Sequence, residues 1–312
     1  MEDNGMTTVH GGNVYEIASR LGCAPEEILD YSASINPYGP PPGLAEVLGR
    51  SYPLLQHYPD IHNGHLLDAI ARYHGVSQDQ VVVGNGSTEL IYWLPRVLGI
   101  SKALMVLPTF SEYQKAFELQ GVHLAKLFTS PGNGFQPTVE ELNEVVEQFS
   151  PEAILLTHPG SPAGTLLTHE VRRWLIEKGK GSKVFCILDE VFIDFCEEES
   201  QKKLIDDSDQ FVIIRSMTKF YGLPGLRLGY LLTAEPQAAR LRHYLPPWSI
   251  NTFAQVAGPY CLEQREYREN TLEFIARERG RIEEALQAID GCQVFPGKAN
   301  YLLIKLGNHL PP

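Results

Sequence analysis

Between Ser216 and Tyr230 the chain reads SMTKFYGLPGLRLGY, and this stretch places one lysine between two apolar runs. Lys219 follows a predicted strand at Phe211–Ile214 and precedes another at Leu228–Leu232, among glycine and aromatic residues. A lysine that is partly withdrawn from water has a lowered pKa, and its amine then becomes a nucleophile for carbonyl groups. A single lysine is more often a solvated surface residue, so this hypothesis depends on what other segments bring to the same place.

Four further apolar runs precede these two strands, at Val81–Val83, Ala103–Leu107, Ala153–Leu156 and Val184–Leu188. Their nearly continuous apolar character is typical of strands that are covered on both faces. Helical patterns separate most of them, which predicts an α/β fold with a mostly parallel sheet sandwiched by helices. Leu228–Leu232 follows its predecessor too closely for a helical crossover, which leaves an antiparallel arrangement open for this strand.

Cap and stop residues mark the predicted helices. Thr138 opens one helix with a capping box, and another spans Glu170–Lys178 with Gly179 as its stop. Pro95 falls inside the helical pattern of Thr88–Leu98, where it predicts a kink or an early end.

Three segments differ in composition and pattern. Residues 1–51 are rich in glycine, proline and asparagine, and we interpret them as an N-terminal arm with part of a small domain. Residues 52–255 hold the six strands and form the predicted large domain. Residues 256–312 form a predicted small α+β C-terminal domain, with a long helix at Gln264–Ile289 and strands at Cys292–Phe295 and Tyr301–Lys305.

The formal net charge of -12 argues against nucleic acid or an anionic membrane as the main partner, because both usually bind a basic face. The five cysteines are widely spaced and form no CxxC motif, which favours reduced thiols and a cytoplasmic location. No segment has the pattern of a signal peptide or a membrane span, and the histidines form no HExxH motif. We therefore expect neither membrane attachment nor a metal site.

Polar residues follow the predicted strands, at the edge where open α/β sheets bind ligands. After the first strand, Gly86, Ser87 and Thr88 begin a helix whose free N–H groups and dipole favour an anion. The same residues can also simply cap the helix. A dinucleotide site is disfavoured, because the third glycine of its motif is missing and no acidic residue ends the next strand.

The ends of the later strands add further candidate groups. Phe110 follows the second strand and can either stack on a flat ring or belong to the core. Asp189 ends the fourth strand and, if buried, needs a partner such as a protonated pyridine nitrogen, a salt bridge or a helix start. Ser216 and Arg227 flank Lys219 and can bind phosphate. Together these groups describe one ligand with a phosphate, a flat ring, a basic ring nitrogen and an aldehyde, which is pyridoxal 5'-phosphate (PLP).

The run SMTKFYGLPGLRLGY resembles the cofactor-lysine motif of fold-type-I PLP enzymes in the aminotransferase class I/II group, and the resemblance covers nearly the whole chain. It implies an aspartate-aminotransferase-like fold. Within that group the chain is most similar to the threonine-phosphate decarboxylases of cobalamin biosynthesis. The segments that carry this similarity are HGGN from His10, DYSASINPYGPP from Asp30, YPD from Tyr58, DEVFIDF from Asp189, PPWSINTFAQ from Pro246 and PGKANYLLIK from Pro296. Histidinol-phosphate aminotransferases are next in similarity, and they usually have tyrosine where this chain, like the decarboxylases, has Phe192.

The resemblance implies a role for each matching residue. Lys219 and Asp189 would be catalytic, since the lysine would hold the PLP aldehyde in a Schiff base and the aspartate would keep the ring nitrogen protonated. The other cofactor contacts would be Gly86, Ser87, Thr88, Ser216 and Arg227 at the phosphate, Phe110 on the ring, Ser161 at the ring hydroxyl, and Tyr58 from the neighbouring subunit of a homodimer. The residues near the substrate would be His10, Gly11, Ser34 and Ser161.

Some features depart from the family pattern. Ser161 and Ser34 stand where the family usually has asparagine. The family continues past the position of Pro312 and supplies arginines there for the substrate, so we expect a C-terminally incomplete small domain or a different way of holding the substrate. The resemblance implies decarboxylation of L-threonine O-3-phosphate to (R)-1-amino-2-propanol O-2-phosphate. A histidinol-phosphate-type aminotransferase and a PLP-binding protein without turnover are the alternatives.

Overall fold

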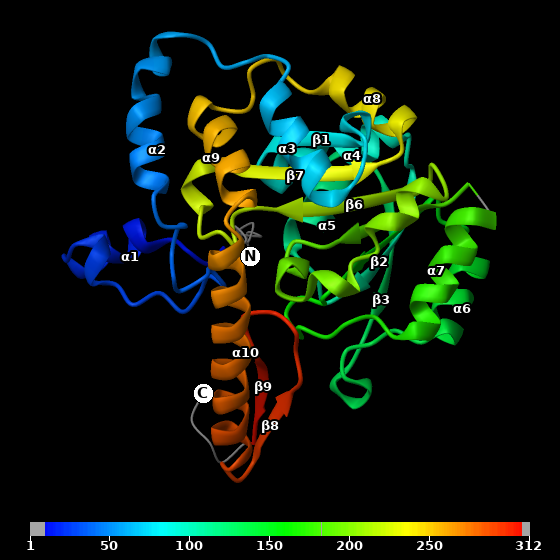
Figure 1. The fold of residues 1–312 in the computed structure, drawn as a ribbon. Helices are drawn as coiled ribbons and strands as arrows, with labels where there is room; N and C mark the ends of the chain where they lie inside the picture. Colours follow the sequence, from blue (N-terminus) through cyan, green and yellow to red (C-terminus); the bar gives the residue numbers. More distant parts are fainter. Residues whose placement is uncertain (1–9, 182, 308–312) are drawn as a thin grey trace, which may run out of the picture.

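The computed structural model describes residues 10–181 and 183–307, and its centre is a seven-stranded sheet (Figure 1). The strand order is β1-β7-β6-β5-β4-β2-β3. The strands are β1 Val81–Asn85, β2 Lys102–Leu107, β3 His123–Phe128, β4 Ala153–Thr157, β5 Phe185–Asp189, β6 Phe211–Ser216 and β7 Leu228–Thr233. β7 runs antiparallel to β6 and β1, and the other neighbouring pairs are parallel. The prediction of a mostly parallel sheet is confirmed, and the last strand takes the antiparallel direction that its short connection allows.

One strand, β3, was not predicted; it lies at the edge of the sheet beside β2. Its residues are all exposed or half-buried, unlike those of the fully buried strands. Lys126 and His123 interrupt its apolar residues, because an edge strand needs only one covered face. β3 therefore lacks the continuous apolar run by which the other strands were predicted.

Alternate side chains of the central strands enter two apolar cores on opposite faces of the sheet. In β6, Val212 and Ile214 belong to one core, while Phe211 and Ile213 belong to the other. The first core is covered by α4 Gly86–Leu98, α5 Ser111–Leu119 and α8 Glu235–Tyr244. The second is covered by α3 Gly64–His74, α6 Val139–Phe149, α7 His169–Gly181, α9 Thr252–Leu262 and α10 Arg265–Gln287. Two covered faces leave the edge at the strands' carboxyl ends open for a site.

The early end that Pro95 allowed and the stop at Gly179 are both wrong, and packing explains each. α4 passes through Pro95 and ends at Leu98, with the surrounding apolar residues buried in the core. α7 continues past Gly179 to Gly181. A Cβ atom on Gly179 would lie 2.3 Å from the Phe211 ring, so this glycine permits close helix–sheet packing and does not stop the helix.

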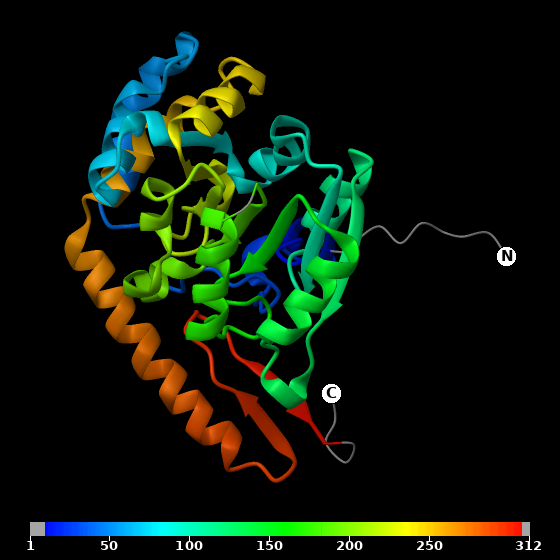
Figure 2. The ribbon, with the colours of Figure 1, turned by 90° about the vertical axis from the view of Figure 1, so that its right-hand side faces the viewer.

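A smaller substructure extends from the seven-stranded sheet and its helices along α10, as Figures 1 and 2 both show. The strands β8 Cys292–Phe295 and β9 Leu303–Leu306 form an antiparallel pair beside this helix. The second strand begins later than the predicted Tyr301, because the Tyr301 hydroxyl donates to the Gly160 carbonyl oxygen, in the loop after β4, at 2.9 Å. The part expected to continue beyond Pro312 lies outside the described residues.

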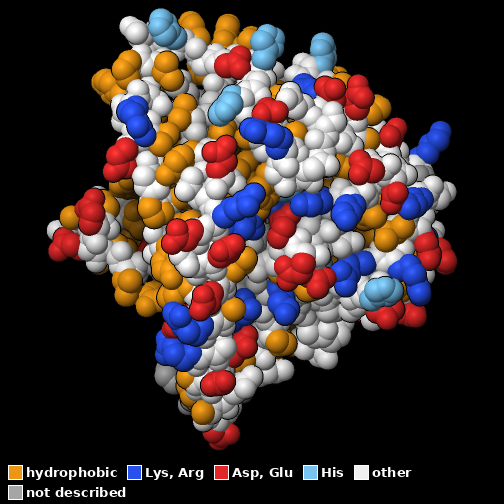
Figure 3. Space-filling model, in the orientation of Figure 1, with side chains coloured by type: hydrophobic (Ala, Val, Ile, Leu, Met, Phe, Trp, Pro, Cys, Tyr) orange, Lys and Arg blue, Asp and Glu red, His pale blue; other side chains and the backbone are white. Residues whose placement is uncertain are grey.

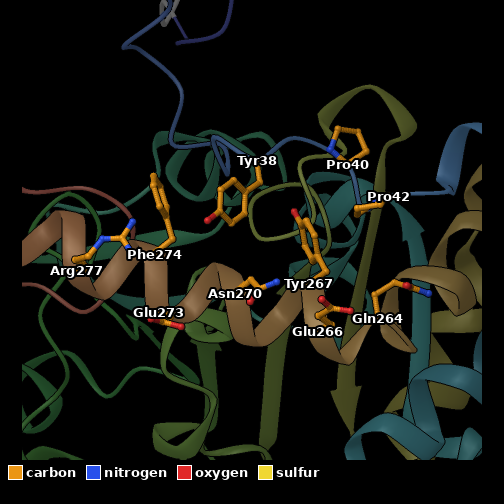
Figure 4. A pocket seen from close by; sticks show the side chains of 10 residues that line it. All are labelled: Tyr38, Pro40, Pro42, Gln264, Glu266, Tyr267, Asn270, Glu273, Phe274 and Arg277. Atoms are coloured by element: carbon orange, nitrogen blue, oxygen red, sulfur yellow. The ribbon is translucent and has the colours of Figure 1, made fainter.

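The N-terminal segment contains α1 Val14–Leu21 and α2 Leu44–Ser51, and the chain between them lies against α10. The Tyr38 ring lies 4.8 Å from the Phe274 ring, and the Tyr267 hydroxyl donates to the Gly39 carbonyl oxygen at 2.7 Å. Figure 4 shows Tyr38 and Phe274 side by side in a surface hollow of about 740 Å³. None of the predicted site residues lines this hollow, which instead marks where the arm meets the helix.

Acidic and basic side chains are interspersed on the face shown in Figure 3. Within residues 10–181 and 183–307, no helix combines the length and the apolar character needed to cross a membrane.

Candidate active site

The predicted site residues come together in one cavity of about 540 Å³ at the carboxyl ends of the parallel strands. Those that line it are His10, Gly11, Ser34, Gly86, Ser87, Thr88, Phe110, Ser161, Asp189, Ser216, Lys219 and Arg227. Tyr58 does not line this cavity. Its side chain is 81% exposed, and its ring lies 4.9 Å from the Trp248 ring.

Lys219 lies in the loop between β6 and β7, and Asn36 of the N-terminal segment holds the backbone of this loop. The Asn36 N–H donates to the Lys219 carbonyl oxygen at 3.0 Å, and Asn36 Nδ2 donates to the Phe220 carbonyl oxygen at 2.8 Å. Burial lowers the pKa of Lys219, the nearby positive charge of Arg227 lowers it further, and Asp189 opposes the shift. The lowered pKa predicted from sequence is therefore present in the structure. It increases the fraction of neutral amine at a given pH.

Asp189 ends β5 with only 5% of its surface exposed. Burial raises the pKa of this carboxyl group, while the Val191 N–H at 3.0 Å, the Tyr113 hydroxyl and the charge of Lys219 lower it. Asp189 and Lys219 thus face the same cavity and act on each other electrostatically. A buried carboxylate with so few donors can accept a hydrogen bond from a protonated ring nitrogen.

Two glycines let the start of α4 close on the strand ends. A Cβ atom on Gly86 would lie 2.4 Å from Arg227 Nη2, and one on Gly229 would lie 2.2 Å from the Ser87 nitrogen. Gly86 also has a φ of +75°, and its N–H donates to the Arg227 carbonyl oxygen at 2.9 Å. Helix N–H groups and a guanidinium meet here, as phosphate binding requires.

The hydroxyl groups beside this helix start come from β6 and the loop after it. Gly229 of β7 pairs with Gly84 of β1 on one side and with Ser216 of β6 on the other, which brings these strand ends together. Ser216 Oγ lies 2.8 Å from Thr218 Oγ1, and both residues line the cavity. Thr218 was missed from sequence, although its place directly before Lys219 gave a signal.

Other lining residues were also missed. Thr157 ends β4, and its Oγ1 lies 2.7 Å from that of Thr109. The rule that ligands bind at strand ends could have found Thr157. Glu112 lies on α5 and left no comparable signal in the sequence.

Phe110, a predicted site residue, precedes α5. Its ring centroid lies 5.8 Å from that of His10 and 6.3 Å from that of Tyr113.

The sequence matches the model of the aminotransferase class I and II family over residues 26–310. The chain belongs to the class I and II aminotransferase family. Its fold is aspartate-aminotransferase-like, and it is an enzyme whose cofactor is PLP, as the family resemblance implied.

Relatives with two different activities are similar to this chain. Threonine-phosphate decarboxylase from Salmonella typhimurium is 34% identical over 302 residues, which are 96% of this chain and 82% of that protein. Histidinol-phosphate aminotransferase from Nicotiana plumbaginifolia is 30% identical, with 93% of this chain and 69% of that protein covered. The crystal structure of histidinol-phosphate aminotransferase from Clostridium acetobutylicum has a TM-score of 0.83 and 30% identity, covering 90% of this chain and 84% of that one.

The cavity of this family member fits PLP. Gly86 and Arg227 form a cup on this cavity: the missing Cβ atom of Gly86 lets the Arg227 guanidinium lie against the start of α4, so both can donate to a phosphate. Lys219 offers an amine of lowered pKa, and Asp189 offers a buried carboxylate on the same cavity. These are the groups that the aldehyde and the ring nitrogen of the cofactor need.

Gly86→Ala is expected to raise the Kd for PLP by about tenfold or more, which corresponds to about 1.4 kcal/mol. The added methyl group would displace the Arg227 guanidinium from the cup. Titration of the cofactor-free protein with PLP, followed by absorbance, measures the change. Gly99→Ala is the matched control, because Gly99 has a similar φ of +70° at the end of the same helix and no neighbouring atom within 4 Å of an added Cβ. Equal Kd values for the two variants would contradict the role of close approach at Gly86.

His158 directly follows β4, and the structure gives it a supporting position. It is fully buried, and its Nδ1 accepts from the Leu167 N–H at 3.1 Å. Its Nε2 therefore carries the hydrogen and donates to the Glu199 carbonyl oxygen at 3.1 Å. Burial lowers the pKa of His158 to about 4, so the side chain is neutral and joins the segments of Leu167 and Glu199 by hydrogen bonds.

A buried ionic cluster lies behind the ends of β5 and β6. Arg215, next to Ser216, is fully buried, and its guanidinium contacts Glu190 at 3.5 Å, Asp194 at 3.3 Å and Glu197 at 2.5 Å. Glu190, next to Asp189, also accepts from Ser200 Oγ at 2.6 Å. Neighbouring residues of a strand point to opposite faces, so Glu190 and Arg215 point away from Asp189 and Ser216. Their ion pair joins the two strand ends that carry Asp189 and Ser216.

Proposed function

We propose that this protein decarboxylates L-threonine O-3-phosphate to (R)-1-amino-2-propanol O-2-phosphate and CO2, as a step of cobalamin biosynthesis. The observation that carries the proposal is the 34% identity to the Salmonella decarboxylase over 96% of the chain. Phe192 supports it, since the histidinol-phosphate aminotransferases usually have tyrosine at this place. Its ring lies 5.8 Å from Lys219 Nζ, and it lines the cavity without a hydroxyl group to donate.

The residues of the cavity would have separate roles in this reaction, in holding the cofactor and in moving a proton. PLP, when bound, supplies a conjugated ring that accepts the electron pair of the bond broken at the substrate's Cα. Asp189 would stay ionised beside the ring nitrogen and hold its proton. Lys219, with its lowered pKa, would deliver a proton to Cα in place of the departing carboxylate. Gly86, Arg227 and their neighbours would keep the cofactor's phosphate at the start of α4.

The substrate's phosphate would lie on the side of the cavity formed by the arm. His10, Gly11 and Ser34 line that side. Contacts to the substrate's phosphate, distant from Cα, would set the rotation of the substrate about its Cα–N bond. They would place the bond from Cα to the carboxylate, and not the Cα–H bond, perpendicular to the cofactor ring. The same site would then favour loss of CO2 over transamination.

We also propose that the protein works as a homodimer, with Tyr58 of each subunit at the cofactor phosphate of the other. The exposure of Tyr58 and its place outside its own cavity support this arrangement. A mass of one chain in sedimentation at micromolar concentration would contradict it.

The test of the proposed function is CO2 release from O-phospho-L-threonine without an added oxo acid. We expect turnover that produces one CO2 and one aminopropanol phosphate per substrate. The second candidate, a histidinol-phosphate aminotransferase, is favoured by the structural similarity to the Clostridium enzyme. Turnover only with histidinol phosphate and 2-oxoglutarate, with glutamate as product, would replace the first proposal by the second.

A further inference from the structure

Among the described residues, two carboxylates line the cavity, Asp189 and Glu112, and the chemistry above uses only the first. Glu112 is the second residue of α5 and is 6% exposed. Its Oε1 accepts from His10 Nε2 at 2.9 Å, and its Oε2 accepts from the Tyr92 hydroxyl at 2.5 Å. Both oxygens are therefore engaged by side chains of the protein.

Hydrogen bonds keep Glu112 ionised in spite of its burial. Burial raises its pKa, but the donors Tyr92 and His10 and the charge of Lys115 lower it more, so the net pKa lies below the usual value. The pKa of Tyr92 is correspondingly raised to about 12, chiefly because its hydroxyl donates to this carboxylate. An ionised carboxylate only accepts hydrogen bonds, so His10 Nε2 must carry the hydrogen. His10 Nδ1 is then the ring nitrogen left for a ligand.

The arm around His10 is also held by its backbone. The Gly12 N–H donates to Ser32 Oγ at 2.8 Å. A Cβ atom on Gly11 would lie 1.9 Å from the Ser32 carbonyl oxygen, so these two segments touch directly. The His10 side chain is still 47% exposed, and the bond to Glu112 is the polar contact that joins its ring to the large domain.

We propose that Glu112 is a positioning residue for substrate recognition: its bond to His10 Nε2 directs the other ring nitrogen, Nδ1, toward the phosphate of the substrate, to which Nδ1 donates when the imidazole carries both hydrogens. The inference rests on the proposed function, in which His10 faces that phosphate. Glu112 itself has no free oxygen for the substrate and would not touch the reacting atoms. Partners of this kind, one contact removed from the ligand, commonly set the tautomer and direction of a histidine.

Glu112→Gln tests this role, because an amide keeps the shape of the side chain but removes its charge. In the holoenzyme we expect the Kd and KM for O-phospho-L-threonine to rise about tenfold, with kcat changed less than about twofold. The Kd for L-threonine, which has no phosphate, should stay the same. Both Kd values are measured by stopped-flow mixing, from the cofactor's rapid absorbance change on binding and before substrate is consumed, so the result does not depend on turnover. Glu118→Gln on the same helix is the control, since Glu118 lies at the surface and pairs with Lys126 at 3.6 Å.

His10→Ala should reproduce the effect, and the double variant should show no further loss, because both changes remove one interaction. Equal losses for O-phospho-L-threonine and L-threonine, or additive losses in the double variant, would overturn the proposal. If Glu112→Gln fails to fold, Tyr92→Phe keeps the carboxylate with one donor fewer, and a smaller phosphate-specific loss is expected. Wild-type protein that binds O-phospho-L-threonine through this pair but releases no CO2 would overturn the decarboxylase function and leave the role of Glu112 standing.

Discussion

Lys219→Ala should lower turnover of O-phospho-L-threonine by at least about 10³-fold, because it removes the amine that both holds the cofactor and moves a proton. Lys219 shares its cavity with Asp189, and its pKa is lowered by burial. Borohydride reduction followed by mass spectrometry should show a covalent cofactor on the wild-type protein and none on the variant. The cup at Gly86 and Arg227 is unchanged, so the variant should still bind PLP without the covalent bond.

Lys203→Ala is the matched control for this experiment. Lys203 is an exposed lysine of the short helix Lys202–Asp206, outside the cavity. It should retain both the covalent adduct and the wild-type turnover. An adduct that persists in Lys219→Ala would mean that another lysine holds the cofactor.

Arg215→Met should lower the free energy of unfolding by about 3–5 kcal/mol at pH 8, because it leaves buried carboxylates without their cation. The Arg215 side chain is fully buried against Glu190, Asp194 and Glu197. Methionine fills a similar volume, so the loss would come mainly from the unpaired charges. Urea unfolding of the holoenzyme and of the variant at equal protein concentration measures the difference.

The loss should shrink at lower pH. Burial raises the pKa of Glu190 from 4.5 to about 7 and that of Asp194 from 3.8 to about 6, while Arg215 holds both values down. Since each folded pKa lies above its unfolded value, the protonated forms favour the fold. Their stabilisation is complete below the unfolded pKa values and is lost as the pH rises through about 6 to 7. At pH 5 both groups are already largely neutral in the wild type, so removal of the arginine should cost less there than at pH 8.

The control for charge removal is Arg281→Met. Arg281 is exposed and pairs with Glu278 at 2.8 Å on the surface of α10, so the expected change is below about 1 kcal/mol. A loss in Arg215→Met that is the same at pH 5 and pH 8 would show that packing, and not buried charge, accounts for the effect.

The sequence was sufficient for the parts of the site that follow strand ends. Lys219, Asp189 and Gly86 each stand within five residues after an apolar run, and parallel strands bring such positions to one edge of the sheet. The antiparallel β7 could be anticipated from the short connection before it. The periodicity of apolar residues could not reveal β3, because an edge strand is only partly covered.

The spacing of apolar residues was enough to predict the alternation of strands and helices, and with it the side chains that the sheet brings to the cavity. Three features could be seen only in the folded chain: His10 bonds Glu112, 102 residues away, Arg215 contacts three carboxylates, and Tyr58 lies outside its own cavity. The physical reason is that local spacing specifies backbone direction and burial, whereas contacts between distant segments depend on how whole helices and loops pack against one another.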